Sequence, residues 1–206
     1  MTIAERYEET IPVPRAIRLP VELIPPEGFD PERLETWPKV AGRLEYVGGR
    51  LLYMPPCGEM QSYTVIDVAT MLGLWVRAHP EFVAGTKEAG LLLQGDTRGL
   101  DAGVWRRRDV GSPRHQFHRV PPVLAVEVAG EDEEEAILRE KAAWYFVRGV
   151  AVVWIVLPEL RELVVITQDG EHRYRVGETL AAHPALPDLT PGVDEFFVQI
   201  AAGSSA

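Results

Sequence analysis

Val123–Ala129 reads VLAVEVA, an apolar stretch of strand length that is interrupted by one acidic residue, Glu127. The segment that follows, Ala136–Arg148, has the pattern of a helix, and Gly149 is placed to end it. Val150–Leu157 is a second continuous apolar run, which is typical of a strand covered on both faces. This order of strand, helix and strand predicts an α/β fold in which helices flank a mixed sheet.

The preceding part of the chain predicts a β-hairpin and a long helix. Arg43–Val47 and Arg50–Met54 flank the pair Gly48–Gly49, which supplies the positive φ that a tight turn requires. From residue 62 to residue 79 apolar residues recur at helical spacing, and Pro80 then ends the pattern. Further strand segments are expected at residues 82–93, 104–105, 163–167 and 172–176.

Length and composition indicate one globular domain. The 206 residues are 46% hydrophobic and 25% charged, which is ordinary for such a domain. We expect residues 1–30, which are rich in proline, to form an irregular arm, residues 31–200 the domain, and residues 201–206 a disordered tail. No apolar run is long enough to span a membrane, and Cys57 is the only cysteine. These features predict a cytoplasmic protein with no membrane partner.

The net charge of −10 counts against avid, non-specific binding of nucleic acid, which depends on neutralising phosphates. The one concentrated basic patch is Arg106–Arg119, which contains five arginines and two histidines and which we expect to be a loop. It follows Asp101, so it could hold phosphates beside a site there. A charged surface loop and a subunit contact are equally open interpretations.

Asp101, Glu127 and Lys141 carry the groups that metal-dependent phosphodiester cleavage requires. A carboxylate within a buried strand is costly unless it is paired, metal-bound or functional. Asp101 and Glu127 can meet at the ends of neighbouring strands, where their oxygens would reach one Mg²⁺. Lys141, on the following helix, can orient a water or stabilise charge on phosphorus. The alternatives are a turn residue at Asp101, a structural ion pair at Glu127 and an exposed lysine at Lys141.

Several segments together resemble the Uma-two family of restriction-endonuclease-like proteins, a branch of the PD-(D/E)XK nuclease superfamily. The resemblance runs from about Leu44 to Phe197, and order and spacing carry it rather than any single motif. The matching segments and residues are Leu44–Gly49, Met54–Pro56, Asp101, Val126–Val128, Lys141, Tyr145, Gly149–Val150, Val153–Val156 and Leu189–Gly192.

This resemblance implies a restriction-endonuclease-like core with an N-terminal arm and added β-hairpins, and an endonuclease that hydrolyses DNA. Asp101 and Glu127 would bind Mg²⁺ or Mn²⁺, and Lys141 would stand in for the family's usual lysine, which is Ala129 here. Glu45 is a candidate fourth ligand or water-orienting acid, or else a solvent-facing hairpin residue. A homodimer is expected, because cleavage of two strands calls for two sites.

Departures from the family pattern favour an alternative. Leu100 replaces a proline before Asp101, Val123 replaces an acid, and Met60 stands where a histidine is common. With the net charge of −10, they favour a catalytically inactive binding or assembly protein that keeps the nuclease fold. An enzyme acting on a small phosphoester would also suit the acidic surface.

Overall fold

The computed structural model describes residues 19–112, 116–131 and 133–202. Within these ranges one mixed sheet of nine strands has the order β1-β3-β2-β5-β6-β7-β8-β9, and β4 also pairs with β5. The strands are β1 (Val21–Leu23), β2 (Arg43–Val47), β3 (Arg50–Met54), β4 (Phe82–Leu93), β5 (Asp96–Arg106), β6 (Leu124–Val128), β7 (Val152–Leu157), β8 (Glu162–Thr167) and β9 (Gly170–Arg175).

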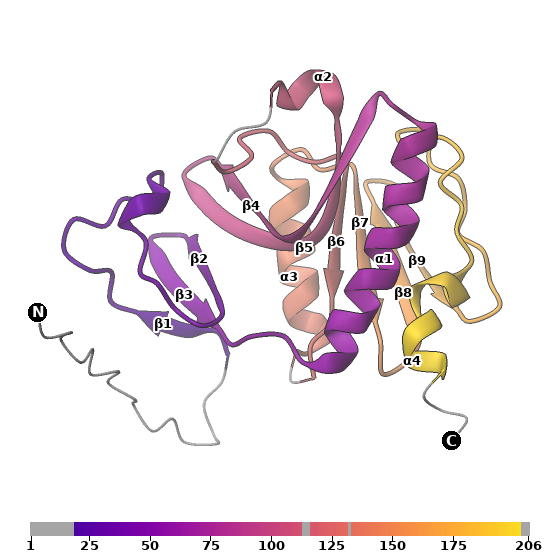
Figure 1. The fold of residues 1–206 in the computed structure, drawn as a ribbon, viewed down its shortest axis with the longest axis horizontal. Coiled ribbons are helices and arrows are strands. Elements are labelled where there is room, and N and C mark those ends of the chain that lie inside the picture. The colour runs from indigo at the N-terminus through magenta and orange to yellow at the C-terminus, as the bar shows by residue number, and fades with distance from the viewer. Residues whose placement is uncertain (1–18, 113–115, 132, 203–206) are drawn as a thin grey trace, which may run out of the picture.

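Helices cover both faces of this sheet, with the long α1 on one face and α3 on the other (Figure 1). The helical segments are η1 (Leu34–Thr36), α1 (Glu59–Ala78), α2 (Arg107–Val110), α3 (Glu135–Phe146), η2 (Val193–Phe196) and α4 (Val198–Ala202). None of the helices in the described part of the chain has the length and apolar composition that crossing a membrane requires.

Strand β6 shows how the alternation of side chains divides the core. Leu124, Val126 and Val128 lie in the cluster that includes the buried residues of α1. Ala125 lies in the opposite cluster, with Leu138 and other buried residues of α3. Because side chains along a strand alternate between the two faces of a sheet, residue 127 lies on the face that α3 covers.

The apolar strands β6 and β7 pair in parallel, with α3 as the connection between them. A parallel pair requires such a crossover, and Gly149, three residues after the end of α3, adopts a φ of +92°. Val150 N–H then donates to Tyr145 O at 3.2 Å, and Gly149 N–H donates to Phe146 O at 3.1 Å. These bonds close the helix and turn the chain into β7, as the sequence predicted.

The sheet forks along β5. One edge of β5 pairs with β4 from Asp96 to Arg106. Its other edge meets β2 at Thr97 and β6 at Ala102–Val104, and no pair is formed in between. The β1–β3 hairpin lobe therefore diverges from the helix-covered part of the sheet, as Figure 1 shows. Asp101 lies in the gap between the two branches.

The predicted hairpin, the two long helices and the mixed sheet are present, and differences are local. Within the expected irregular arm, residues 21–23 form the edge strand β1, while residues 1–18 lie outside the described residues. Part of the expected basic loop, residues 107–110, forms the short helix α2, and residues 113–115 lie outside the described ranges. Residues 201–202 of the expected tail end α4, and 203–206 lie outside.

Candidate active site

Glu127 is a fully buried carboxylate in β6 whose two oxygens are both bonded to α3. Lys141 Nζ donates to Glu127 Oε2 at 3.0 Å, and the Tyr145 hydroxyl donates to Oε1. Lys141 and Tyr145 are four residues apart, which places them on the same side of the helix. Burial alone would raise the pKa of Glu127, but Lys141, Arg43 and the Tyr145 hydroxyl outweigh it and lower that pKa. Glu127 is therefore ionised at neutral pH.

Lys141 is buried between two carboxylates rather than exposed on the helix. Its ammonium bonds to Glu127 Oε2 and to Glu133 Oε1, each at 3.0 Å. Burial would lower the pKa of Lys141, but Glu127, with help from Glu45 and Glu133, raises it above its ordinary value. The side chain is thus a fixed positive charge at neutral pH, which suits electrostatic stabilisation and excludes proton abstraction by a neutral amine.

Asp101 lies beside Glu127 at the fork. The register that pairs Ala102 with Val126 continues to place Asp101 opposite Glu127. Asp101 Oδ2 accepts a hydrogen bond from Val128 N–H at 2.7 Å, a backbone group that the fork leaves free. Burial and the neighbouring Glu127 carboxylate raise the pKa of Asp101 to about 7, against the opposing effect of Arg43. Asp101 is thus protonated for part of the neutral range unless a further cation is present.

Glu45 closes the fork from the β2 side and is only 1% exposed, so it is not a solvent-facing hairpin residue. Glu45 Oε2 accepts from Arg98 Nη1 at 3.0 Å, and Oε1 accepts from Gly99 N–H at 3.3 Å. The second bond occupies the Gly99 amide on the edge of β5 that pairs with neither β2 nor β6 at this position. Glu45 is therefore bonded to two residues of β5, the strand that also carries Asp101.

Three members of the cluster, Arg43, Arg98 and Glu133, were missed by sequence reasoning. Arg43, two residues before Glu45 and on the same face of β2, places Nη1 3.6 Å from Asp101 Oδ1 and Nε 3.7 Å from Glu45 Oε1. Glu133, in the acidic segment before α3, accepts a hydrogen bond from Lys141 Nζ at 3.0 Å. The i, i+2 spacing to a candidate acid is the signal that would have pointed to Arg43.

The charges of the cluster nearly balance. Its four carboxylates are Asp101, Glu127, Glu45 and Glu133, and its three cations are Arg43, Lys141 and Arg98. No group of three or more His, Cys, Asp or Glu side chains in the described ranges has the arrangement of a preformed metal site. The Asp101–Glu127 pair nevertheless fits a hard divalent cation, because both side chains offer oxygen donors and Glu127 is near enough to contribute, after burial, to the raised pKa of Asp101.

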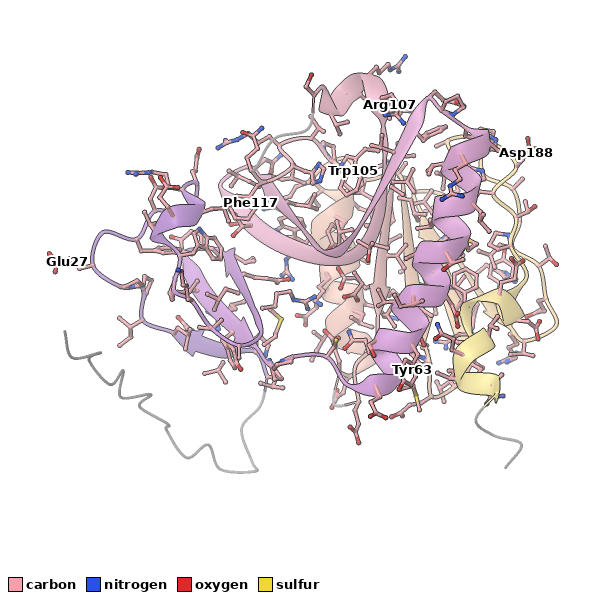
Figure 2. The ribbon with its side chains drawn as sticks, in the orientation of Figure 1. Glu27, Tyr63, Trp105, Arg107, Phe117 and Asp188 are labelled. Carbon is pink, nitrogen blue, oxygen red and sulfur yellow. The ribbon has the colours of Figure 1, made fainter. Side chains whose placement is uncertain are left out.

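The basic patch lies away from this cluster. Arg106 is five residues further along β5 than Asp101, which corresponds to roughly 17 Å of extended strand. Arg107 donates to Pro80 O and Phe82 O, and Arg119 pairs with Glu32. Figure 2 shows Arg107, the first residue of α2, at the end of the sheet. The described arginines of this patch therefore do not reach the Asp101 site, contrary to the interpretation that they hold phosphates beside it.

The pKa of Asp101 leads to a stability prediction for the metal-free protein. The unfolded chain loses the Asp101 proton near the ordinary pKa of 3.8, whereas the folded chain keeps it up to about pH 7. Between these values the folded state binds more protons, so its stability falls as the pH rises, by on the order of 4 kcal/mol in total. Asp101→Asn removes this loss, and we expect its advantage over the native chain to grow from pH 4 to pH 7.

Urea unfolding in EDTA at pH 4, 5, 6, 7 and 8 measures this difference. Asp101→Asn also removes a partner of Arg43, which changes the free energy of unfolding by a similar amount at every pH. The test is therefore how the difference in this free energy between variant and native chain changes with pH. Asp169→Asn, at an exposed turn, makes the same chemical change outside the cluster and should show no such slope. A pH-independent difference between Asp101→Asn and the native chain would contradict the raised pKa.

The sheet with a helix on each face, forked at a buried cluster of acids and a lysine, defines a nuclease-like α/β fold. A solved structure, that of a "putative nuclease belonging to DUF820" from Anabaena variabilis ATCC 29413, is similar, with a TM-score of 0.70. It is 12% identical, and the similarity covers 80% of this chain and 94% of that one. None of the curated proteins compared with the chain matches it.

The family model of the Uma-two (Uma2) proteins, which carries the description "Putative restriction endonuclease", matches residues 31–199. The chain therefore belongs to the Uma-two family, as the sequence resemblance indicated.

Proposed function

We propose that this chain is a divalent-metal-dependent endonuclease that hydrolyses phosphodiester bonds of DNA, with Mg²⁺ or Mn²⁺ as its cofactor. The observation that carries the proposal is the convergence of Asp101, Glu127 and Lys141 on one fork of the sheet. The family description supports nuclease chemistry, and the cluster supplies the residue types that such chemistry uses.

Each residue has a part that follows from its position. Asp101 and Glu127 would hold the cation, which when bound lowers the pKa of a water and neutralises charge on the phosphate. The Lys141 ammonium stabilises negative charge that develops on the phosphoryl oxygens. Tyr145 acts as a positioning residue, because its hydroxyl fixes the rotamer of Glu127. Glu45 holds Arg98 and the Gly99 amide, and so keeps β5 in place beside Asp101.

The proposal is tested by cleavage of supercoiled plasmid and of single-stranded DNA in Mg²⁺, in Mn²⁺ and in EDTA. Active native protein should cut in both metals and not in EDTA, and Asp101→Asn should lose the activity while Asp169→Asn keeps it. Cleavage that is equal in Asp101→Asn and the native chain would contradict the assignment. A homodimer is part of the proposal, and sedimentation of the native chain tests it.

The affinity for Mn²⁺ should depend on pH. A cation at Asp101 must displace its proton below the pKa of about 7, so the dissociation constant should rise by roughly tenfold per pH unit below pH 7. Above pH 7 the affinity should level off. Calorimetric titration of the native chain with Mn²⁺ at pH 5.5, 6.5, 7.5 and 8.5 measures it, and an affinity that is flat across this range would exclude Asp101 as a ligand.

A second candidate is a catalytically inactive binding or assembly protein with the nuclease fold. Arg43 favours it, because this buried guanidinium already lies between the carboxylates of Asp101 and Glu45. Charge compensation by Arg43 stabilises the cluster without a metal. Absence of both Mn²⁺ binding and cleavage in the native chain would support this candidate over the endonuclease.

A further inference from the structure

A hollow with a volume of about 320 Å³ lies between the β1–β3 lobe and the β4–β5 ribbon. Its walls come from η1 and the segment after it, from β2, from β4 at Gly90, and from β5 at Thr97–Gly99. The volume lies within the range of small-molecule sites. Figure 2 shows Phe117, which forms part of the wall, on the side of β4 that faces the lobe.

The charge of this hollow is opposite to that of the whole chain. Its lining contains Lys39, Arg43 and Arg98, and none of its described lining residues is acidic. By contrast, a larger hollow of about 550 Å³ near the ends of β6 and β7 is lined by five glutamates and no basic residue. In a chain with a net charge of −10, a polyanion is therefore attracted to the Lys39 side of the site and repelled from the other.

The basic hollow is continuous with the candidate active site. Arg43 lines the hollow and also lies 3.6 Å from Asp101, and Arg98 lines it while bonding to Glu45 at 3.0 Å. A phosphate held by these two guanidinium groups would lie next to the acids of the fork. The hollow is thus placed to lead a phosphate chain toward Asp101.

Two of the basic groups have unused donors. Arg43 is 9% exposed, and its buried Nε has no hydrogen-bond partner, since Glu45 Oε1 is 3.7 Å away. Arg98 Nε is also buried without a partner. Buried donors of this kind are normally satisfied, so both guanidinium groups, which line the hollow, are incompletely bonded within the protein. Lys39 is exposed and forms no ion pair with any described residue.

The same hollow has aromatic walls. Trp37 and Phe117 both line it and are partly exposed, with ring centroids 5.6 Å apart. Phe117 packs directly on the β4 backbone at Gly90, where a Cβ would lie 2.6 Å from its ring. Aromatic rings beside cationic groups are the combination that binds unpaired bases and their phosphates. A small hollow of this shape accommodates a single base rather than a duplex.

We propose that this hollow binds one nucleotide of single-stranded DNA, with the base on Trp37 and Phe117 and the adjoining phosphates on Lys39, Arg98 and Arg43. The inference deepens the proposed nuclease function, because it names the strand that is presented to Asp101. It also predicts that the chain binds single-stranded DNA without a metal, since binding of the strand does not require cleavage.

The test is fluorescence anisotropy of a labelled oligothymidylate with the full chain in EDTA, where no cutting occurs. Phe117→Leu keeps the bulk but removes the ring, and we expect it to weaken binding by about three- to tenfold. Lys39→Gln should weaken binding comparably and lower the dependence of log K on log salt by about 0.7, the value for one phosphate. Arg108→Gln, an equal charge change in the exposed helix α2, should bind like the native chain.

Two further ligands sharpen the result. A strand of the same length with abasic sites retains the phosphates, and it should bind as weakly to the native chain as thymidylate does to Phe117→Leu. A duplex of that length should bind more weakly than the single strand. Native affinity in both Phe117→Leu and Lys39→Gln, an absence of binding by the native chain, or preference for the duplex would each overturn the inference.

The outcomes separate this inference from the endonuclease proposal. Binding that depends on Phe117 and Lys39, in a chain that never cleaves in Mg²⁺ or Mn²⁺, would support the hollow and contradict the endonuclease. Metal-dependent cleavage by the native chain, together with native binding affinity in Phe117→Leu and Lys39→Gln, would support the endonuclease and contradict the hollow as the binding site.

Discussion

Glu127→Gln should abolish metal-dependent cleavage while leaving the chain folded. The substitution keeps the size of the side chain but removes the charge that one of the two proposed metal ligands supplies. We expect the rate to fall by more than the roughly 10–100-fold that loss of an outer-shell partner of a metal site costs. Stability should fall by less than the about 3–5 kcal/mol of an orphaned buried charge, because Glu133 still bonds to Lys141.

Single-turnover cleavage of plasmid and urea unfolding measure these two effects. Glu140→Gln, at an exposed position on α3, makes the same change of charge next to Lys141 and should retain native rates and stability. A Glu127→Gln variant that is folded and cleaves at the native rate would remove Glu127 from the metal site.

Lys141→Met should have the second largest effect, on activity and on stability together. The variant leaves the buried Glu127 carboxylate with the Tyr145 hydroxyl but without its ammonium partner. Loss of an electrostatic donor of this kind lowers a rate by on the order of 10²- to 10³-fold. Removing one member of a buried ion pair costs about 3–5 kcal/mol of stability.

The stability loss in Lys141→Met should depend on pH. In the native chain the lowered pKa of Glu127 stabilises the fold above the ordinary value of 4.5, and this contribution is lost as the pH falls through the folded value. Without Lys141 that pKa rises, so the variant loses stability as the pH increases. The gap between native and variant should therefore widen from pH 4 to pH 8, which urea unfolding measures. Arg77→Met on the exposed side of α1 is the control, and a gap of constant size would contradict the account.

Much of the fold could be predicted because local patterns agree with the tertiary structure. The hairpin bounds Arg43–Val47 and Arg50–Met54 follow from the Gly48–Gly49 turn, and the structure has the same bounds. The unbroken apolar runs predicted β6 and β7, because strands covered on both faces need no alternation. Glu127 was identified by the same logic, since an acid in such a run needs a partner.

The parts that could not be predicted depend on contacts between distant segments. The fork arises because one edge of β5 pairs first with β2 and then with β6, and no local pattern encodes this change of partner. The position of Arg43 beside Asp101 follows from the fork. An acidic run before a helix is usually a solvated helix start, so nothing local distinguishes Glu133, which bonds to the buried Lys141.

Arg43 is the residue on which the two candidate functions differ most. In the endonuclease a cation must share the space around Asp101 with this guanidinium, whereas in an inactive protein Arg43 is the permanent counter-charge. Burial would lower the pKa of Arg43, but Glu45 and the other acids raise it, so it stays charged under all ordinary conditions. The choice between the candidates therefore depends on whether a divalent cation binds beside it.

The most direct measurement of the central claim is anomalous diffraction from crystals of the native chain soaked in Mn²⁺ at pH 8. We predict a peak bonded to one oxygen of Asp101 and one of Glu127, and its loss in Glu127→Gln crystals. A peak only among the glutamates that line the larger acidic hollow, or no peak at all with Arg43 unmoved, would contradict the claim that these residues form a metal-dependent nuclease centre.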